Sequence, residues 1–215
     1  MSDATDTLTM NKRVYIASYG CQMNARDSEE VLGILTAQGY AITQQPEAAD
    51  VLLLNTCSVR QQAEARAIGK MWEFSHLKET RPELVLGVIG CMAKLHQAAI
   101  FTQVPAVDLV AGPAELYDLP YLIAEIQEKR QRPAVSTPHA EKIVAVGRAF
   151  RPLDQKPQGD YRRPGVTAFV TIMEGCDKAC TYCIVPMTRG REVSRLASDI
   201  VAEIVGLADA GYKDI

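Results

Sequence analysis

The stretch VLLLNTC, residues 51–57, is an almost unbroken apolar run that ends on a cysteine. Such a run, without polar alternation, is typical of a parallel strand that is buried on both faces. The stretches RVYIASYG at residues 13–20 and LVLGVIGC at residues 84–91 have the same character. DLVAG, residues 108–112, predicts a weaker strand, and YAITQ, residues 40–44, predicts an edge strand. We therefore expect a largely parallel sheet.

Helical patterns separate these strands. Asp27 followed by Glu30 resembles a capping box, and Gly39 fits the position just after a helix C-terminus. Further helices are predicted over residues 60–79 and 114–130. The apolar face of the first of these would consist of Ala63, Ala67, Ile68, Met71 and Trp72. Because strands alternate with helices, residues 11–131 are predicted to form an α/β domain with a doubly wound parallel sheet.

The composition changes after this domain. Residues 132–164 contain five of the eleven prolines and are predicted to be a linker. These five are Pro133, Pro138, Pro152, Pro157 and Pro164. VTAFVTIM at residues 166–173 predicts a strand, and residues 197–210 predict a helix. The apolar face of this helix would consist of Ile200, Val201, Ile204, Val205 and Ala208. Since a (β/α) barrel needs roughly 200 residues or more, residues 165–215 are expected to hold only the first βα unit of a truncated barrel.

Composition limits the class of protein. The formal net charge of −3 and the pI near 5.7 argue against a chain that is basic overall, so contacts to nucleic acid would need a local patch. The N-terminal stretch MSDATDTLTMNKR lacks the apolar run of a secretory signal, and no window approaches ~18 uncharged apolar residues. We therefore expect a cytoplasmic protein without membrane spans. In that compartment, six cysteines indicate metal ligands or catalytic thiols more often than disulfides.

Three of the cysteines are tightly spaced. Within GCDKACTYCIVP, residues 175–186, Cys176, Cys180 and Cys183 form a C-x3-C-x2-C pattern. Zinc ribbons use two cysteine pairs or cysteine and histidine sets, and ferredoxin runs have a different spacing with a fourth cysteine. Three thiolates without a fourth nearby favour an iron–sulfur cluster with one iron open to a small ligand.

The other three cysteines, Cys21, Cys57 and Cys91, each follow a predicted strand. The carboxyl ends of strands form the edge of an open α/β sheet where ligands bind, so the three thiols are expected to converge there. The alternative is that each is a small buried core residue, as free cysteines often are.

The C-x3-C-x2-C pattern of Cys176, Cys180 and Cys183, with Tyr182 just before the last cysteine, resembles the radical S-adenosylmethionine (SAM) superfamily. The stretches YGCQMNARDSE, LNTCSVR, GVIGCMAK, DLVAGP and GVTAFVTIMEGCDKACTYCIVPMTRGREVSR are similar to the MiaB-type tRNA methylthiotransferases, over about residues 11–215. This resemblance implies two [4Fe–4S] clusters. Cys176, Cys180 and Cys183 would hold the radical-generating cluster that binds SAM, and Cys21, Cys57 and Cys91 would hold the auxiliary cluster.

The resemblance also implies an activity and partners. The enzyme would methylthiolate C2 of N6-isopentenyladenosine at tRNA position 37, with a radical that abstracts hydrogen and a methylthio group carried at the auxiliary cluster. Its partners would be the tRNA anticodon stem-loop and an electron donor such as flavodoxin or ferredoxin, and the protein would be a monomer. Because the family continues with most of the barrel and an RNA-binding module, we expect the 215-residue chain to be inactive alone.

Related subfamilies provide alternatives. The ribosomal-protein enzymes carry proline and glycine where this chain has Gln22 and Ser58. The relatives that act on threonylcarbamoyladenosine in tRNA are a closer alternative, although CQMN, NTCSVR and TRGREVSR favour the isopentenyladenosine enzyme. A non-catalytic iron–sulfur or zinc-binding module is the alternative from another class.

A few polar residues near the cysteines are further candidates, although none is assigned as catalytic. Tyr182, Arg189 and Arg191 are assigned to cofactor binding, because arginine forks fit the SAM carboxylate or tRNA phosphates. The alternative for the arginines is a solvated loop. Asn24 and Asn55 could donate hydrogen bonds to cluster sulfur, or could simply be turn or cap residues.

Overall fold

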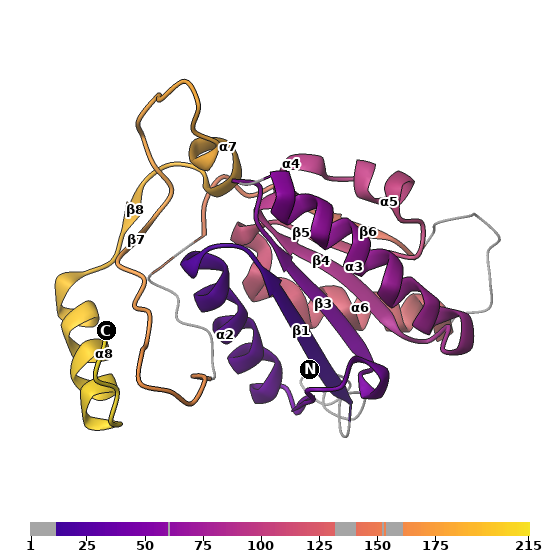
Figure 1. The fold of residues 1–215 in the computed structure, drawn as a ribbon, viewed down its shortest axis with the longest axis horizontal. Helices are drawn as coiled ribbons and strands as arrows, with labels where there is room; N and C mark the ends of the chain where they lie inside the picture. Colours follow the sequence, from indigo (N-terminus) through magenta and orange to yellow (C-terminus); the bar gives the residue numbers. More distant parts are fainter. Residues whose placement is uncertain (1–11, 60, 132–140, 152, 154–160) are drawn as a thin grey trace.

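The computed structural model describes residues 12–59, 61–131, 141–151, 153 and 161–215. A six-stranded sheet occupies the centre of the molecule (Figure 1). Its strands are β1 (Arg13–Tyr19), β2 (Ala41–Ile42), β3 (Val51–Thr56), β4 (Val85–Gly90), β5 (Leu109–Ala111) and β6 (Ile143–Ala145). Every neighbouring pair in this sheet is parallel. The predicted α/β class and the edge strand at residues 40–44 are confirmed.

The order of the strands decides where a site can form. They lie in the order β2-β1-β3-β4-β5-β6, so the chain steps one way from β1 to β2 and then continues the other way from β3. This is the flavodoxin-like arrangement, in which the switch in direction lies between the carboxyl ends of the first and third strands. Ligands bind at such a switch point, since the connecting helices diverge from it to opposite faces.

Helices cover both faces of the sheet. One face carries α2 (Gln22–Ala37), α6 (Leu119–Gln131) and the 3-10 helix Pro113–Asp118. The other carries α3 (Gln61–Thr80), α4 (Cys91–His96) and α5 (Ala99–Gln103), while a further 3-10 helix, Pro46–Ala48, precedes β3. Alternate residues of β3 point into the two layers, so that Leu53 packs with the α2 layer and Leu54 with the α3 layer. Burial on both sides explains the unbroken apolar run that predicted this strand.

The start of α2 differs from the prediction. The helix begins at Gln22 with Cys21 as its N-cap, so Asp27 is not a capping residue but lies buried in the second turn. The capping-box prediction was wrong because an aspartate near a helix start can either cap the helix or form ion pairs. Here Asp27 pairs with arginines from later in the chain. The predicted stop is confirmed. Gly39 has φ 87°, and the amide of Tyr40 donates to the Leu35 carbonyl at 3.1 Å, as in a Schellman motif.

Two further expectations need adjustment. Met71 is fully buried as predicted, whereas Trp72 is 47% exposed and does not belong to the core face of α3. Residues 143–145 fall in the predicted linker but form β6, which extends the sheet beside β5. Pro133, Pro138, Pro152 and Pro157 lie outside the described residues.

The C-terminal part contains β7 (Met173–Glu174), α7 (Val185–Arg189), β8 (Val193–Ser194) and α8 (Ala197–Asp209). β7 and β8 pair antiparallel. The strand predicted over residues 166–173 forms only in part: Met173 belongs to β7, and Thr167 makes a single parallel bridge to Asp214. A strand is stabilised by hydrogen bonds to a neighbouring strand along its whole length, whereas here such pairing occurs only near the two ends of the predicted segment. The barrel itself stays a prediction.

The predicted helix near the C-terminus is α8, but its packing differs from the prediction. Val201 and Val205, on the expected apolar face, are exposed, and Leu207 is the buried residue. In the part of the chain that the structure describes, no helix combines the length and the apolar character needed to cross a bilayer.

Candidate functional site at the strand ends

Three cysteines lie at the carboxyl ends of three neighbouring strands. Cys57 directly follows β3 and Cys91 directly follows β4, whose last residues, Thr56 and Gly90, are register partners. Cys21 follows β1 after one further residue and caps α2. Because neighbouring strands lie about 4.7–4.9 Å apart, this register brings the three cysteines to one edge, at the β1/β3 switch point. Cys57 and Cys91 are buried there, and Cys21 is exposed.

The backbone around these cysteines is closely packed. A Cβ atom on Gly90 would lie 2.5 Å from Asn55 Oδ1 and 2.7 Å from the Thr56 carbonyl oxygen. Gly90 also has φ 93°, which side-chain-bearing residues rarely adopt. A Cβ atom on Gly20 would come within 2.8 Å of Cys57 Cβ. Glycine therefore lets the strand ends approach one another beside the thiols.

Asn24 and Asn55 form a buried hydrogen-bond network between the strand ends. The Asn24 amide donates to Asn55 Oδ1 at 2.8 Å, and the Asn55 amide donates to the Asn24 carbonyl at 2.9 Å and to Ser28 Oγ at 3.0 Å. Asn24 Oδ1 also accepts from the Cys21 backbone amide at 3.3 Å. The amide groups of both side chains are thus used within the fold and not for hydrogen bonds to cluster sulfur. Asn24 acts as a cap of α2, whereas Asn55 is a strand residue and neither a turn nor a cap.

Burial and one arginine set the protonation of the two inner thiols. Burial raises the pKa of Cys57, and the Val59 backbone amide that donates to its sulfur at 3.3 Å opposes the increase. Burial also raises the pKa of Cys91, and the neighbouring Arg189 guanidinium opposes it. The neighbouring Cys21 adds to the increase in the pKa of Cys57. Cys57 and Cys91 are thus favoured as thiols, and a bound cation would displace their protons.

The second cysteine group lies on the loop between β7 and α7. The Cys183 amide donates to the Cys180 carbonyl at 3.1 Å, and the Cys176 amide donates to the Gly190 carbonyl at 3.1 Å. Gly175, with φ 71°, has no room for a Cβ atom, because it would overlap the Arg191 carbonyl. The loop is therefore closed at its base by backbone contacts, while Cys180 at its tip is exposed.

The structure separates the three residues assigned to cofactor binding. Tyr182 is 91% exposed on the loop. Arg191 is exposed too, and its Nε lies 3.5 Å from Asp177 Oδ1. Arg189, by contrast, is buried, and its guanidinium contacts Asp27 and Glu174.

Neither cysteine group is preformed as a metal cage. Within the described ranges, no three cysteine, histidine, aspartate or glutamate side chains come together closely enough to hold a metal ion. The donor chemistry and the placement at a switch point nevertheless fit an iron–sulfur cluster, since such clusters take cysteine thiolates.

Comparisons with known proteins agree with this arrangement. Residues 13–112 match the model of "Uncharacterized protein family UPF0004". A tRNA-2-methylthio-N(6)-dimethylallyladenosine synthase of Paraburkholderia phytofirmans is 44% identical over 208 residues, which are 96% of this chain and 43% of that protein. Proteins of the same name from Thiobacillus denitrificans and Syntrophomonas wolfei are each 44% identical, over 95% and 93% of this chain and 44% and 42% of their own lengths.

The resemblance to the tRNA methylthiotransferases is confirmed. The chain spans less than half the length of these relatives. All three cysteines of the first group belong to the residues that match UPF0004, and the second group lies in the part that follows them.

Buried ion pairs connect the UPF0004 residues to that following part. Arg151 Nη1 lies 3.1 Å from Asp27 Oδ1 and 2.9 Å from Glu30 Oε2, and its Nη2 pairs with Glu174. Arg189 Nη2 lies 2.5 Å from Asp27 Oδ2. Burial opposes ionisation of Asp27, but the two arginines outweigh it and lower its pKa. Sequence reasoning missed this cluster, because Arg151 lies in the proline-rich segment and Asp27 resembled a cap.

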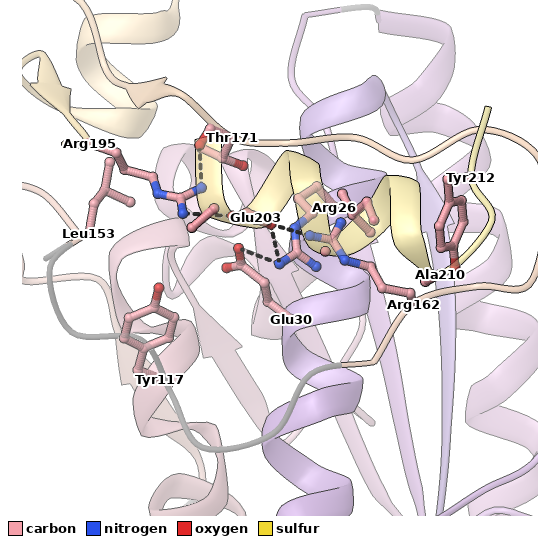
Figure 2. A pocket seen from close by; sticks show the side chains of 13 residues that line it. Arg26, Glu30, Tyr117, Leu153, Arg162, Thr171, Arg195, Glu203, Ala210 and Tyr212 are labelled. Atoms are coloured by element: carbon pink, nitrogen blue, oxygen red, sulfur yellow. Dashed lines mark hydrogen bonds and ion pairs between the residues drawn. The ribbon is translucent and has the colours of Figure 1, made fainter. Parts of the chain in front are cut away.

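A second charged cluster attaches α8 to the UPF0004 residues. Arg26, Arg162 and Arg195 converge on Glu203 (Figure 2). Arg195 Nη2 lies 2.6 Å from Glu203 Oε2, and its Nη1 donates to the Thr171 carbonyl at 2.7 Å. The cluster lines a cavity of about 650 Å³ between α2 and α8. Glu29 and Glu30 also pair with Arg26, and Glu29 with Arg162, so three carboxylates balance the three arginines. The cavity is therefore not a basic surface of the kind that binds RNA phosphates.

Proposed function

We propose that this chain supplies the two cysteine groups of a radical SAM tRNA methylthiotransferase that modifies C2 of N6-isopentenyladenosine at tRNA position 37. The observation that supports the first group is the register of β1, β3 and β4, which brings Cys21, Cys57 and Cys91 to one edge at the switch point. The names of the relatives support the choice of substrate, because dimethylallyladenosine is the same nucleoside.

Each cysteine group would hold one [4Fe–4S] cluster. Cys21, Cys57 and Cys91 would hold the auxiliary cluster, and Cys176, Cys180 and Cys183 the one that binds SAM. When bound, the two clusters would supply the one-electron chemistry that an unactivated aromatic C–H bond requires, together with the sulfur to be transferred.

The residues around the thiols would shape the two sites. Burial of Cys57 and Cys91 keeps water from the inner side of the first group. The Asn24–Asn55 network fixes the strand ends, so the thiolates keep their positions when a cluster binds. Gly175 lets the second loop fold back on its own base. Tyr182 and Arg191 are exposed on that loop and would contact SAM, although Arg191 also pairs with Asp177.

The partners would be the anticodon stem-loop of tRNA and a one-electron donor such as flavodoxin or ferredoxin, and we propose that the protein works as a monomer in the cytoplasm. The net charge of −3 fits recognition of tRNA by a local surface better than by the whole chain.

Two alternatives lead to different outcomes. A methylthiotransferase acting on threonylcarbamoyladenosine would use the same cysteines, and only the modified nucleoside would distinguish it. A zinc-binding module would use the thiols for structure alone.

Anaerobic reconstitution with iron and sulfide tests the cysteine assignment. We expect about eight irons per chain for the wild type and about four for each triple variant, since each cluster contains four irons. The variants are Cys21→Ala/Cys57→Ala/Cys91→Ala and Cys176→Ala/Cys180→Ala/Cys183→Ala. After reduction, SAM should change the electron paramagnetic resonance signal of the first variant and leave that of the second unchanged. Tight zinc binding without iron uptake would favour the structural module.

The substrate is tested in cells that lack their own enzyme. A protein with these residues in its full-length context should restore 2-methylthio-N6-isopentenyladenosine, detected by mass spectrometry of digested tRNA. Either triple variant should restore none. Appearance of methylthiolated threonylcarbamoyladenosine instead would favour the first alternative.

A further inference from the structure

A buried ion pair joins helices that follow two different cysteine groups. Asp27 lies in α2, which Cys21 caps, and Arg189 ends α7, which follows Cys183. Their side chains are 1% and 5% exposed, and Arg189 Nη2 lies 2.5 Å from Asp27 Oδ2. The two residues are 162 positions apart in the chain. The pair therefore determines how distant segments meet.

Other charges complete this pair on both sides. Arg189 Nη1 lies 3.4 Å from Glu174 Oε1, and Arg151 binds both Asp27 and Glu174. A buried charge is costly unless it is paired with good geometry, so loss of one partner leaves the others uncompensated. The arrangement accordingly selects one orientation of α7 relative to α2.

Arg189 also reaches the first cysteine group. Helix α7 packs against α4, the helix that begins at Cys91. Burial raises the pKa of the Cys91 thiol, and the positive charge of Arg189, which this packing brings near Cys91 at the end of α7, opposes the increase. The charge of Arg189 thus acts on a thiol of one group while its backbone continues from the loop of the other. An arginine in this position is enclosed by protein and is not presented to SAM or to tRNA.

We propose that Arg189 is a positioning residue: anchored by Asp27 and Glu174, it seats the second cysteine loop against the first group and places its positive charge beside Cys91. The part that concerns the charge rests on the proposed function, because it matters only if Cys91 holds a cluster. A positive charge beside a cluster stabilises the more negative, reduced state and raises its potential, as hydrogen bonds and net charge do in general.

Hydrogen exchange on the metal-free chain tests the seating. In Arg189→Gln and in Asp27→Asn, amides of α4 and α7 should exchange at least tenfold faster than in the wild type, while amides of β3 stay unchanged. Arg191→Gln is the matched control, because this arginine lies on the same segment but is exposed, and it should leave α4 unchanged. Wild-type exchange in Arg189→Gln would overturn the proposal. If Arg189→Gln fails to fold, Asp27→Asn and Arg189→Lys decide, since the lysine keeps the charge but loses the two-pronged contact.

A redox titration tests the charge and separates it from mere structural support. In the Cys176→Ala/Cys180→Ala/Cys183→Ala background, only the first group is left to take up a cluster. Arg189→Gln should make its one-electron reduction at least tenfold less favourable, a fall of 59 mV, and Arg189→Lys should recover most of that loss. An unchanged potential would overturn the charge role. Absence of iron uptake by the wild type would contradict the proposed function, and the exchange experiment would still decide the seating.

Discussion

Asn24 and Asn55 bind each other at the point where β1 and β3 end: the Asn24 amide donates to Asn55 Oδ1 at 2.8 Å, and both side chains are fully buried. Asn55 belongs to β3, and Asn24 to the first turn of α2. The pair thus joins the two segments that carry Cys21 and Cys57. The backbone hydrogen bonds of the sheet fix only the residues within the strands. The contact between these two side chains therefore holds the residues that follow the strand ends.

Replacing Asn55 by alanine should lower the free energy of unfolding by about 1–3 kcal/mol, because it removes the buried hydrogen bonds between Asn55 and Asn24 and leaves the Asn24 amide with the longer, 3.3 Å bond to the Thr56 carbonyl. Urea unfolding followed by circular dichroism would measure this. Asn55→Asp is the sharper variant: it keeps the shape but cannot donate to the Asn24 carbonyl. If aspartate were tolerated without loss, the network would not have the importance given to it here.

Two glycine-to-alanine changes should have opposite effects. Gly90 combines φ 93° with a Cβ position 2.5 Å from Asn55 Oδ1, so Gly90→Ala should destabilise the protein by at least about 1–3 kcal/mol. Gly69 lies inside α3, where a Cβ atom would meet nothing within 4 Å. Gly69→Ala should therefore stabilise by about 0.5–1 kcal/mol through its higher helix propensity. Thermal unfolding of both variants checks the signs, and equal effects would contradict the role of Gly90.

The strands and the cysteines at their ends could be predicted from the sequence, because they depend on local patterns. An apolar run that ends on a turn or a cysteine specifies both a buried strand and the position of its last residue, as in residues 51–57. Parallel pairing then places Cys57 and Cys91 side by side without further information. Which residues of a helix face the core was harder to predict. Met71 and Trp72 are neighbours at the border of one apolar stripe, and only Met71 is buried.

The charged clusters could not be predicted, because they depend on pairing between distant segments. Asp27 contacts Arg189 across 162 positions, and nothing in either neighbourhood specifies the other. Arg189 follows a cysteine loop, where a contact to an anionic ligand is the simplest expectation. Only the packing of α7 on α4 shows that it is enclosed. Similar reasoning applies to Glu203, whose three arginines come from separate parts of the chain.

Asp108 directly precedes β5 and lies at the amino ends of the strands, opposite to the ends that carry the cysteines. Its carboxylate accepts from Lys78 Nζ and Arg130 Nη2, each at 2.6 Å, and from the Leu86 backbone amide at 2.8 Å. Asp108→Asn should cost about 3–5 kcal/mol of unfolding free energy, because the largely buried Lys78 loses its carboxylate partner and Arg130 is left with the half-exposed Glu141. Glu141→Gln is the control, since this half-exposed carboxylate also pairs with Arg130 but should contribute at most about 1 kcal/mol. Urea unfolding would measure both, and comparable losses would argue against a special role for Asp108.

Glu203 should make the attachment of α8 sensitive to acid. Burial opposes its ionisation, but the hydrogen bond from Arg195 and the charges of Arg195, Arg162 and Arg26 outweigh burial and lower its pKa. A carboxylate with a lowered pKa contributes stability that is complete above its unfolded value, about 4.3, and is lost as the pH falls through the folded value. Glu203→Gln should therefore reduce the unfolding free energy by about 1–3 kcal/mol near neutral pH.

The difference between the wild type and Glu203→Gln should shrink as the pH falls below about 4, because the wild-type carboxyl then becomes neutral as well. Urea unfolding over a series of pH values would measure this difference directly. Glu125→Gln is the matched control, since Glu125 forms an exposed pair with Lys129 on α6 and should show only a small difference at every pH. A difference for Glu203→Gln that did not change with pH would mean that glutamine loses packing rather than charge, and that the three arginines are held in place by other contacts.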